Sequence, residues 1–80
     1  MQKPDTKPGP YYVSVRRENG DYRFLAGPYA THQAALDDVP KVSELAYKYD
    51  PRGVWYSYGT CRITDGSYTE PGIFNAKGLI

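Results

Sequence analysis

The residues best suited to acid–base or metal chemistry are few and lie apart in the sequence. His32 is the only histidine among the 80 residues, and Asp37 and Asp38 follow it about a helical turn later. Cys61 is the only cysteine, and no histidine lies near it in the sequence. A zinc site needs several such ligands, and an activated thiol needs a neighbouring base or positive charge. The glycine-rich phosphate-binding motifs are missing as well. The sequence therefore predicts a protein that is not an enzyme and holds no metal or cofactor.

Arginine and tyrosine side chains point to binding instead. The chain has nine tyrosines, and tyrosine is frequent at interfaces because it joins a large apolar area to a polar tip. Arg16 and Arg23 are predicted to lie opposite each other on neighbouring strands, which is unfavourable unless an acidic group, an anion or a partner covers them. Tyrosines of a third strand would complete an aromatic and basic sheet face. The candidate partner-binding residues on this face are Tyr12, Arg16, Arg23, Tyr56, Tyr58 and Arg62.

This predicted face has three interpretations. It is typical of a protein interface anchored by tyrosine and arginine. It is equally typical of a single-stranded nucleic-acid site, where bases stack on rings and phosphates meet arginine. The third interpretation is a solvated sheet whose arginines are neutralised by acidic residues such as Glu18 or Asp21. The net charge of +1, from ten Lys/Arg and nine Asp/Glu, does not select among them.

A hairpin turn at Asn19-Gly20 sets the expected register of the first two strands, residues 11–17 and 22–26. Asn-Gly suits a two-residue type I′ turn, in which both central residues have positive φ. Arg16 would then lie opposite Arg23, and Val15 opposite Phe24. This register places Val13, Val15, Phe24 and Ala26 on one face, and Ser14, Arg16, Arg23 and Leu25 on the other, with Tyr12 just beyond.

One helix is predicted over residues 32–49. Thr31 is a suitable N-cap, and apolar residues recur at spacings of 4, 3, 4 and 3 from Ala35 to Tyr49. Pro40 lies inside this pattern and removes one backbone donor, so we expect a kink rather than a break. The turn at residues 50–53 ends the helix because it contains both proline and glycine.

Residues 54–63 are predicted to form the third strand. Its small residues Ser57, Gly59 and Cys61 share one face with Trp55 and Ile63, and a helix could approach that face closely. We therefore expect this face to be inward and Tyr56 and Tyr58 to be outward. The reverse assignment stays open, because alternation alone does not say which side is buried. It would make the tyrosine side the core and move Trp55 to the outer face.

Together these elements predict an α+β domain: a three-stranded, mainly antiparallel sheet in ββαβ order, with one kinked helix on one face. Residues 1–10 are expected to be a flexible arm, residues 11–63 the domain, and residues 64–80 a C-terminal tail. The tail carries four large apolar residues, so we expect it to dock on the sheet or to form a subunit contact in a weak homodimer. Those residues are Ile73, Phe74, Leu79 and Ile80.

Location and membrane contact are predicted from what the sequence lacks. It has no apolar run long enough to span a bilayer and no N-terminal signal, and its lone cysteine suits a reducing compartment. We therefore expect a soluble, cytoplasmic protein with no membrane partner.

Several short motifs resemble those of small proteins of phages and other bacterial mobile elements. They are Gly27-Pro28-Tyr29, Thr31-His32, Asp50-Pro51-Arg52 and Trp55-Tyr56-Ser57-Tyr58-Gly59-Thr60, within a match from about Tyr11 to Ile63. No activity or binding residue is established for that group. The resemblance implies a non-catalytic protein that engages a host protein or nucleoprotein complex, as an anti-CRISPR-like or host-takeover inhibitor does. The alternative is a single-stranded nucleic-acid-binding protein that uses the same Tyr/Arg face.

Overall fold

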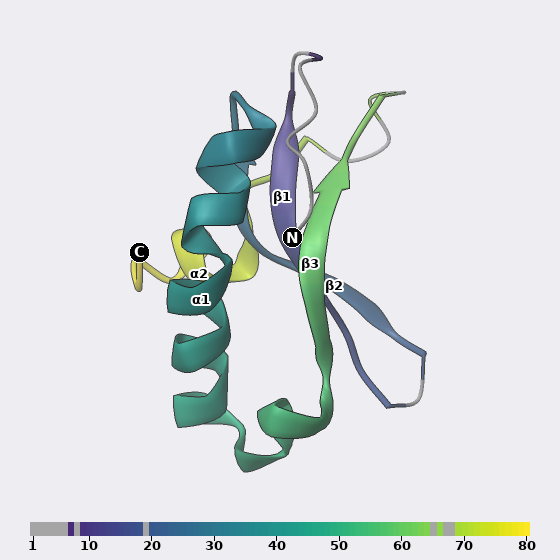
Figure 1. Cartoon of the computed structure of the whole chain (residues 1–80). Helices are drawn as coiled ribbons and strands as arrows, with labels where there is room; N and C mark the ends of the chain where they lie inside the picture. Colours follow the sequence, from purple (N-terminus) through teal and green to yellow (C-terminus); the bar gives the residue numbers. More distant parts are fainter. Residues whose placement is uncertain (1–6, 8, 19, 65, 67–68) are drawn as a thin grey trace.

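The structure is a computed structural model that describes residues 7, 9–18, 20–64, 66 and 69–80. Its elements are β1 (Tyr11–Arg16), β2 (Tyr22–Tyr29), α1 (His32–Tyr49), the 3-10 helix η1 (Pro51–Trp55), β3 (Ser57–Arg62) and α2 (Ile73–Ala76). Strand β1 lies between β2 and β3 and is antiparallel to both, and α1 covers one face of this sheet (Figure 1). The predicted α+β fold in ββαβ order is confirmed. The predicted arm, residues 1–10, lies mostly outside the described residues.

Helix α1 begins and ends where its sequence predicts. The Thr31 hydroxyl accepts a hydrogen bond from the Ala34 backbone N–H at 3.2 Å, which satisfies one of the free donors of the first turn. Ala35 and Val42 are buried against the sheet, and the helix continues through Pro40. At the other end the Asp50 backbone N–H donates to the Ala46 carbonyl at 2.9 Å.

The register of the β1–β2 hairpin differs from the predicted one. The Arg17 N–H donates to the Asp21 carbonyl and the Gly20 N–H to the Arg17 carbonyl, both at 2.9 Å. Three residues therefore separate the paired ends instead of two, with Gly20 at φ +87°. The predicted conformation of Asn19 lies outside the described residues. Arg16 consequently pairs with Tyr22, so the predicted Arg16–Arg23 pairing is wrong.

A bulge in β2 exchanges the faces of two large side chains. Ser14 pairs with Phe24 and Val13 with Ala26, so Leu25 is an extra residue on β2. Leu25 is buried in the core, while Phe24 shares the other face with Tyr12, their ring centroids 5.3 Å apart. The prediction of Phe24 inward and Leu25 outward is therefore wrong.

The tyrosine side of β3 faces the helix, opposite to our expectation. Val13 pairs with Thr60 and Val15 with Tyr58, and directly paired residues of an antiparallel sheet share a face. Val13 and Val15 belong to the core beneath α1. The small residues Ser57, Gly59 and Cys61 therefore lie on the helix-free face. Size did not decide this, because Tyr58 fits under the helix by packing edge-on against Tyr47, with ring centroids 5.6 Å apart.

The C-terminal segment wraps around the β2 edge of the sheet. On the helix-free face the Tyr12 hydroxyl donates to the Glu70 carbonyl at 2.8 Å. At the edge the Gly72 N–H donates to the Gly27 carbonyl at 3.0 Å, and the close approach leaves no room for a side chain at Gly72. On the helix side α2 buries Phe74, which is 7% exposed. The tail is therefore docked on its own chain.

Candidate interaction surface

The six predicted partner-binding residues do not share one surface. Tyr12 and Arg16 belong to the helix-free face of the sheet, but Tyr12 is 0% exposed and cannot reach a partner. The others lie on or next to the helix-facing side, where Tyr56 and Tyr58 pack against the core. Pairing places Arg23 opposite Val15 and Arg62 opposite Tyr11 on that same side. Arg16 is the one predicted residue that the structure leaves accessible on the helix-free face.

Tyr56 and Tyr58 close the turn between α1 and β3. The Tyr56 hydroxyl donates to Asp50 Oδ2 at 2.8 Å, and the Tyr58 hydroxyl donates to the Gly53 carbonyl at 3.0 Å. The first bond lowers the pKa of Asp50 and raises the pKa of Tyr56, while burial raises the pKa of Tyr58 to about 12. Asp50 Oδ1 also accepts the Arg52 N–H at 3.0 Å. These bonds hold η1 in one conformation.

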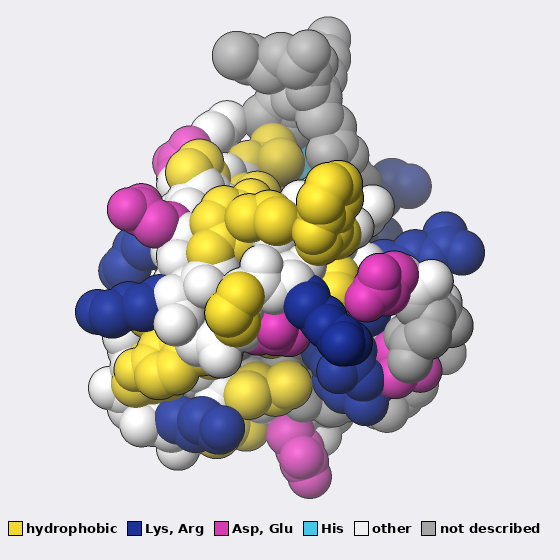
Figure 2. All heavy atoms as spheres, turned by 90° about the horizontal axis from the view of Figure 1, so that it is seen from below, with side chains coloured by type: hydrophobic (Ala, Val, Ile, Leu, Met, Phe, Trp, Pro, Cys, Tyr) yellow, Lys and Arg dark blue, Asp and Glu magenta, His cyan; other side chains and the backbone are white. Residues whose placement is uncertain are grey.

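The held turn presents apolar side chains to solvent. Trp55 is 77% exposed and its neighbour Val54 is exposed as well, as is Tyr49 at the end of α1. Large apolar side chains gathered in the open often mark an interaction site. Figure 2 views the end of the molecule where α1 meets η1 and shows hydrophobic side chains beside several basic ones.

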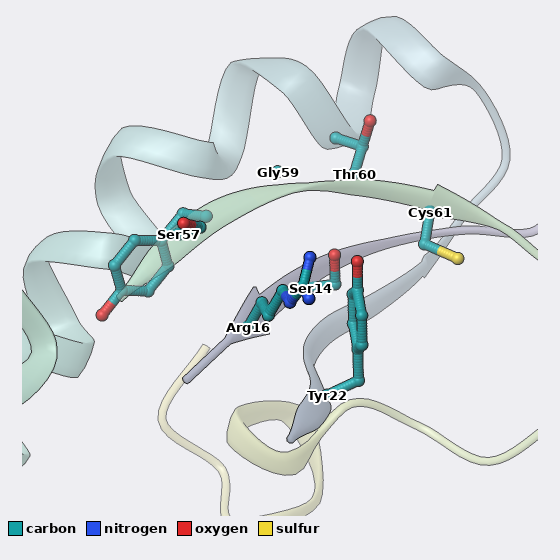
Figure 3. Close-up of a pocket in the computed structure, with 8 residues that line it drawn as sticks. Ser14, Arg16, Tyr22, Ser57, Gly59, Thr60 and Cys61 are labelled. Atoms are coloured by element: carbon teal, nitrogen blue, oxygen red, sulfur yellow. The ribbon is translucent and has the colours of Figure 1, made fainter. Parts of the chain in front are cut away.

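A groove of about 370 Å³ runs over the helix-free face of the sheet (Figure 3). Its floor is made by small residues, among them Ser14, Gly59 and Cys61, and a side chain added at Gly59 would meet nothing within 4 Å. Arg16 and Tyr22 also line it. The Arg16 guanidinium lies 5.9 Å from the centroid of the Tyr22 ring, a cation–π contact on an exposed surface.

A second groove of about 300 Å³ adjoins the first, since Arg16 and Ser57 line both. Trp55 lines the second groove, so Arg16 is flanked by grooves that reach Tyr22 on one side and Trp55 on the other. We call this set the interaction surface. It comprises Arg16, Tyr22, Trp55, Ser57 and Gly59.

The sequence analysis did not name Tyr22 as a binding residue. It placed Trp55 on the outer face only under the reverse assignment of the third strand. Tyr22 becomes the partner of Arg16 through the one-residue change in the hairpin register, which the Asn-Gly motif did not indicate. Trp55 carried a usable signal. It lies two residues after the proline- and glycine-containing turn at residues 50–53, close to a segment whose composition favours a surface position.

The residues suited to chemistry, His32 and Cys61, do not lie together with further ligands or bases in the described part of the chain. His32 is buried, stacked on Tyr11 with ring centroids 5.0 Å apart, and its Nε2 lies 2.8 Å from the Thr60 hydroxyl. Burial raises the pKa of the Cys61 thiol, which disfavours the reactive thiolate. Within the described ranges, no three His, Cys, Asp or Glu residues group closely enough to hold a metal ion. Nor is any helix in the described part of the chain both long and apolar enough to cross a bilayer.

The structure is a small α+β domain whose named interaction surface carries exposed aromatic side chains and a basic one, Arg16. Neither a protein-family model, a curated protein nor a solved structure matches the chain.

Proposed function

We propose that this chain is a non-catalytic binding protein, encoded by a phage or mobile element, that engages a host protein or nucleoprotein complex through the interaction surface. The observation that supports this is the position of Arg16 between exposed Tyr22 and Trp55. Tryptophan, tyrosine and arginine are the residue types that dominate binding energy at protein interfaces. An anti-CRISPR-like or host-takeover inhibitor would act by occupying a host surface in this way.

The position of Trp55 is set before any partner arrives. Two phenol hydrogen bonds hold the turn that carries it, and Gly53 within this turn is buried against Tyr47 and Tyr58. A side chain on a rigid element loses less backbone freedom on binding than one on a mobile loop. Trp55 is therefore suited to serve as an anchor that enters a pocket on the partner.

Charge on the surface indicates what the partner offers. Arg17 and Arg23 share Asp21, at 2.6 and 3.6 Å, and Arg52 lies 3.9 Å from Glu18. Among the residues that the structure describes, Arg16 has no acidic partner; its contact is with the Tyr22 ring. A carboxylate on the partner, placed next to an apolar pocket for Trp55, would complement both groups.

A protein partner fits this surface better than single-stranded nucleic acid does. Base-stacking sites use several accessible rings in a row. On the helix-free face Tyr12 is buried and Phe24 is half-buried, so the exposed rings of the interaction surface are Tyr22 and Trp55. They flank Arg16 from different grooves instead of forming a continuous row.

The test is capture from a bacterial lysate, with and without nuclease, by the wild type and three variants. We expect a protein that survives nuclease treatment to be retained by the wild type and by Lys41→Glu, a control on the exposed side of α1. Trp55→Ala and Arg16→Glu should lose it, because each removes a main contact without opening a core cavity. Loss of all binding after nuclease would favour the nucleic-acid alternative. Equal capture by all four proteins would exclude this surface.

A further inference from the structure

A cavity of about 330 Å³ lies on the helix-facing side of the sheet, separate from the interaction surface. We call it the end cavity. Its inner wall is apolar and includes the buried residues Val15, Leu25 and Phe74, with Ala46 of α1 beside them. The volume falls within the usual range for small-molecule sites, about 300 to 1,000 Å³. An apolar ligand body of modest size can therefore be accommodated.

Cationic groups line the mouth of the end cavity. Arg17, Arg23 and Lys77 all contribute to its lining: Arg17 directly follows β1, Arg23 is in β2, and Lys77 caps the C-terminal end of α2. The one carboxylate in the lining is Asp50, whose oxygens already accept the Tyr56 hydroxyl and the Arg52 N–H. Asp21, which pairs with both arginines, is not part of the lining. The lining therefore carries more positive than negative charge.

Arg17 has a donor that the described residues leave unsatisfied. Its Nη2 meets Asp21 at 2.6 Å, but its Nε is buried and has no hydrogen-bond partner. A buried donor without an acceptor is unfavourable, and a charged one more so. Nη2 shares one edge of the guanidinium with Nε and is already bound to Asp21, so a ligand carboxylate meets the guanidinium from its Nη1 side.

We propose that the end cavity binds a small organic carboxylate with an apolar body, such as a medium-chain fatty acid. The apolar part lies against Val15, Leu25 and Phe74. The carboxylate lies at the mouth, where it meets the positive charges of Arg17, Arg23 and Lys77. Arg16 and Tyr22 are on the opposite face of the sheet and do not line the end cavity, whereas Arg17 borders both the end cavity and the second groove.

Octanoate is the probe. Its controls are 1-octanol and octylammonium, which have an alkyl chain of the same length and differ only in the head group. Titration of the full chain, followed by amide chemical shifts in two-dimensional NMR, gives both affinity and location. We expect octanoate to shift the amides of Ala46, Arg23 and Phe74 and to bind about tenfold or more tightly than 1-octanol. Octylammonium should bind more weakly than both.

Two variants test the head-group contacts. Arg17→Lys keeps the positive charge but replaces the planar guanidinium by a single ammonium group, and we expect it to weaken octanoate binding severalfold while 1-octanol is unaffected. Lys77→Gln removes an exposed charge and should weaken octanoate by a smaller factor, so it keeps the test valid if Arg17→Lys disturbs the hairpin. Arg16→Lys is the matched control. It changes the neighbouring arginine, on the other face, and should bind octanoate as the wild type does.

The proposal is overturned if 1-octanol binds as tightly as octanoate, since the cations would then have no role. It is also overturned if octanoate shifts amides away from the end cavity, or if Arg17→Lys and Lys77→Gln both bind it like the wild type. None of these three results would affect host-protein capture through Trp55 and Arg16, so the failure of one proposal can be distinguished from the failure of the other.

Discussion

Arg16 and Arg17 are neighbours in the chain and both border the second groove, but only Arg17 reaches the end cavity. Arg16 lies over the Tyr22 ring on the helix-free face. Arg17 lines the end cavity and pairs with Asp21 across the hairpin. The alternation of side chains along a strand explains the difference, because consecutive residues point to opposite faces. One residue type thus gives two binding features with different expected ligands.

Trp55 and Tyr58 should differ in their effect on stability. Trp55→Ala should change the free energy of unfolding by less than about 0.5 kcal/mol, because the side chain is largely exposed. Tyr58→Phe should lower it by about 1 kcal/mol, because the Gly53 carbonyl loses its hydroxyl donor. Urea denaturation followed by circular dichroism measures both. A larger loss for Trp55→Ala than for Tyr58→Phe would show that the tryptophan is a packing residue.

Deprotonation of Tyr56 and Tyr58 should lower the free energy of unfolding at alkaline pH. The pKa of Tyr58 is raised from 10.0 to about 12, chiefly by burial, and that of Tyr56 is raised chiefly by its hydrogen bond to Asp50. The folded chain therefore holds these protons more tightly than the unfolded chain does. Their stabilising effect is complete below pH 10 and is lost as the pH rises toward about 12.

Urea denaturation at neutral pH and across this alkaline range measures the loss. Tyr58→Phe is the control, and its free energy of unfolding should decline less steeply between pH 10 and about 12. An identical decline in the variant would mean that Tyr58 does not contribute to the pH dependence.

At the scale of elements, η1 connects the core to the interaction surface. It is fastened to α1 and β3 by the side chains that pack around Gly53, and it carries Trp55 outward. The turn is therefore the element through which a change in the core would alter the proposed binding site.

Alanine substitutions at two glycines test the contribution of η1 and of the groove floor to stability separately. A Cβ at Gly53 would lie 2.9 Å from the Tyr58 hydroxyl oxygen and 3.0 Å from Tyr47 Cδ1, so Gly53→Ala should destabilise the fold by about 1 to 3 kcal/mol. Gly59→Ala meets nothing within 4 Å and should be neutral or stabilising by up to about 1 kcal/mol. Thermal unfolding compares them. The expected order would be refuted if Gly59→Ala were the more harmful change.

At the scale of the whole molecule, the C-terminal segment completes a small core. An 80-residue domain buries a limited fraction of its surface, so one additional large side chain matters. Phe74 supplies it, while Ile73 and Ile80 pack at the margin. The homodimer through residues 73–80 stays a prediction, and this packing removes much of the apolar surface on which it was based. Sedimentation of the full chain tests it.

Loss of Phe74 should unfold much of the protein. Phe74→Ala should lower the free energy of unfolding by about 3 kcal/mol or more, a large part of what so small a domain has. Leu79→Ala, a more exposed position in the same segment, is the control and should cost much less. Urea denaturation of both variants gives the comparison. Equal, small effects would mean that the tail is not part of the folded core.

The sequence by itself determined the parts of this protein that depend on local signals. Periodic apolar residues and the Thr31 cap predict α1, and alternating β-branched and aromatic residues predict the first two strands from their observed starts. The third strand begins at Ser57 and not at the predicted residue 54, because residues 51–55 form η1. Helix and strand propensities depend on a few neighbouring residues, so α1 and the first two strands can each be predicted from their own residues alone. The existence of an arginine on an exposed sheet face was also predictable, and Arg16 is there.

Only the tertiary structure decided which residues accompany Arg16. Strand alternation has two equivalent solutions, and the choice between them for β3 follows from the hydrogen bonds and ring packing that Tyr56 and Tyr58 make under α1. The extra residue in β2 likewise depends on how Leu25 fits the core. Both are decided by contacts between distant segments. For that reason Tyr12, Tyr56 and Tyr58 became structural residues, while Tyr22 and Trp55 came to flank Arg16.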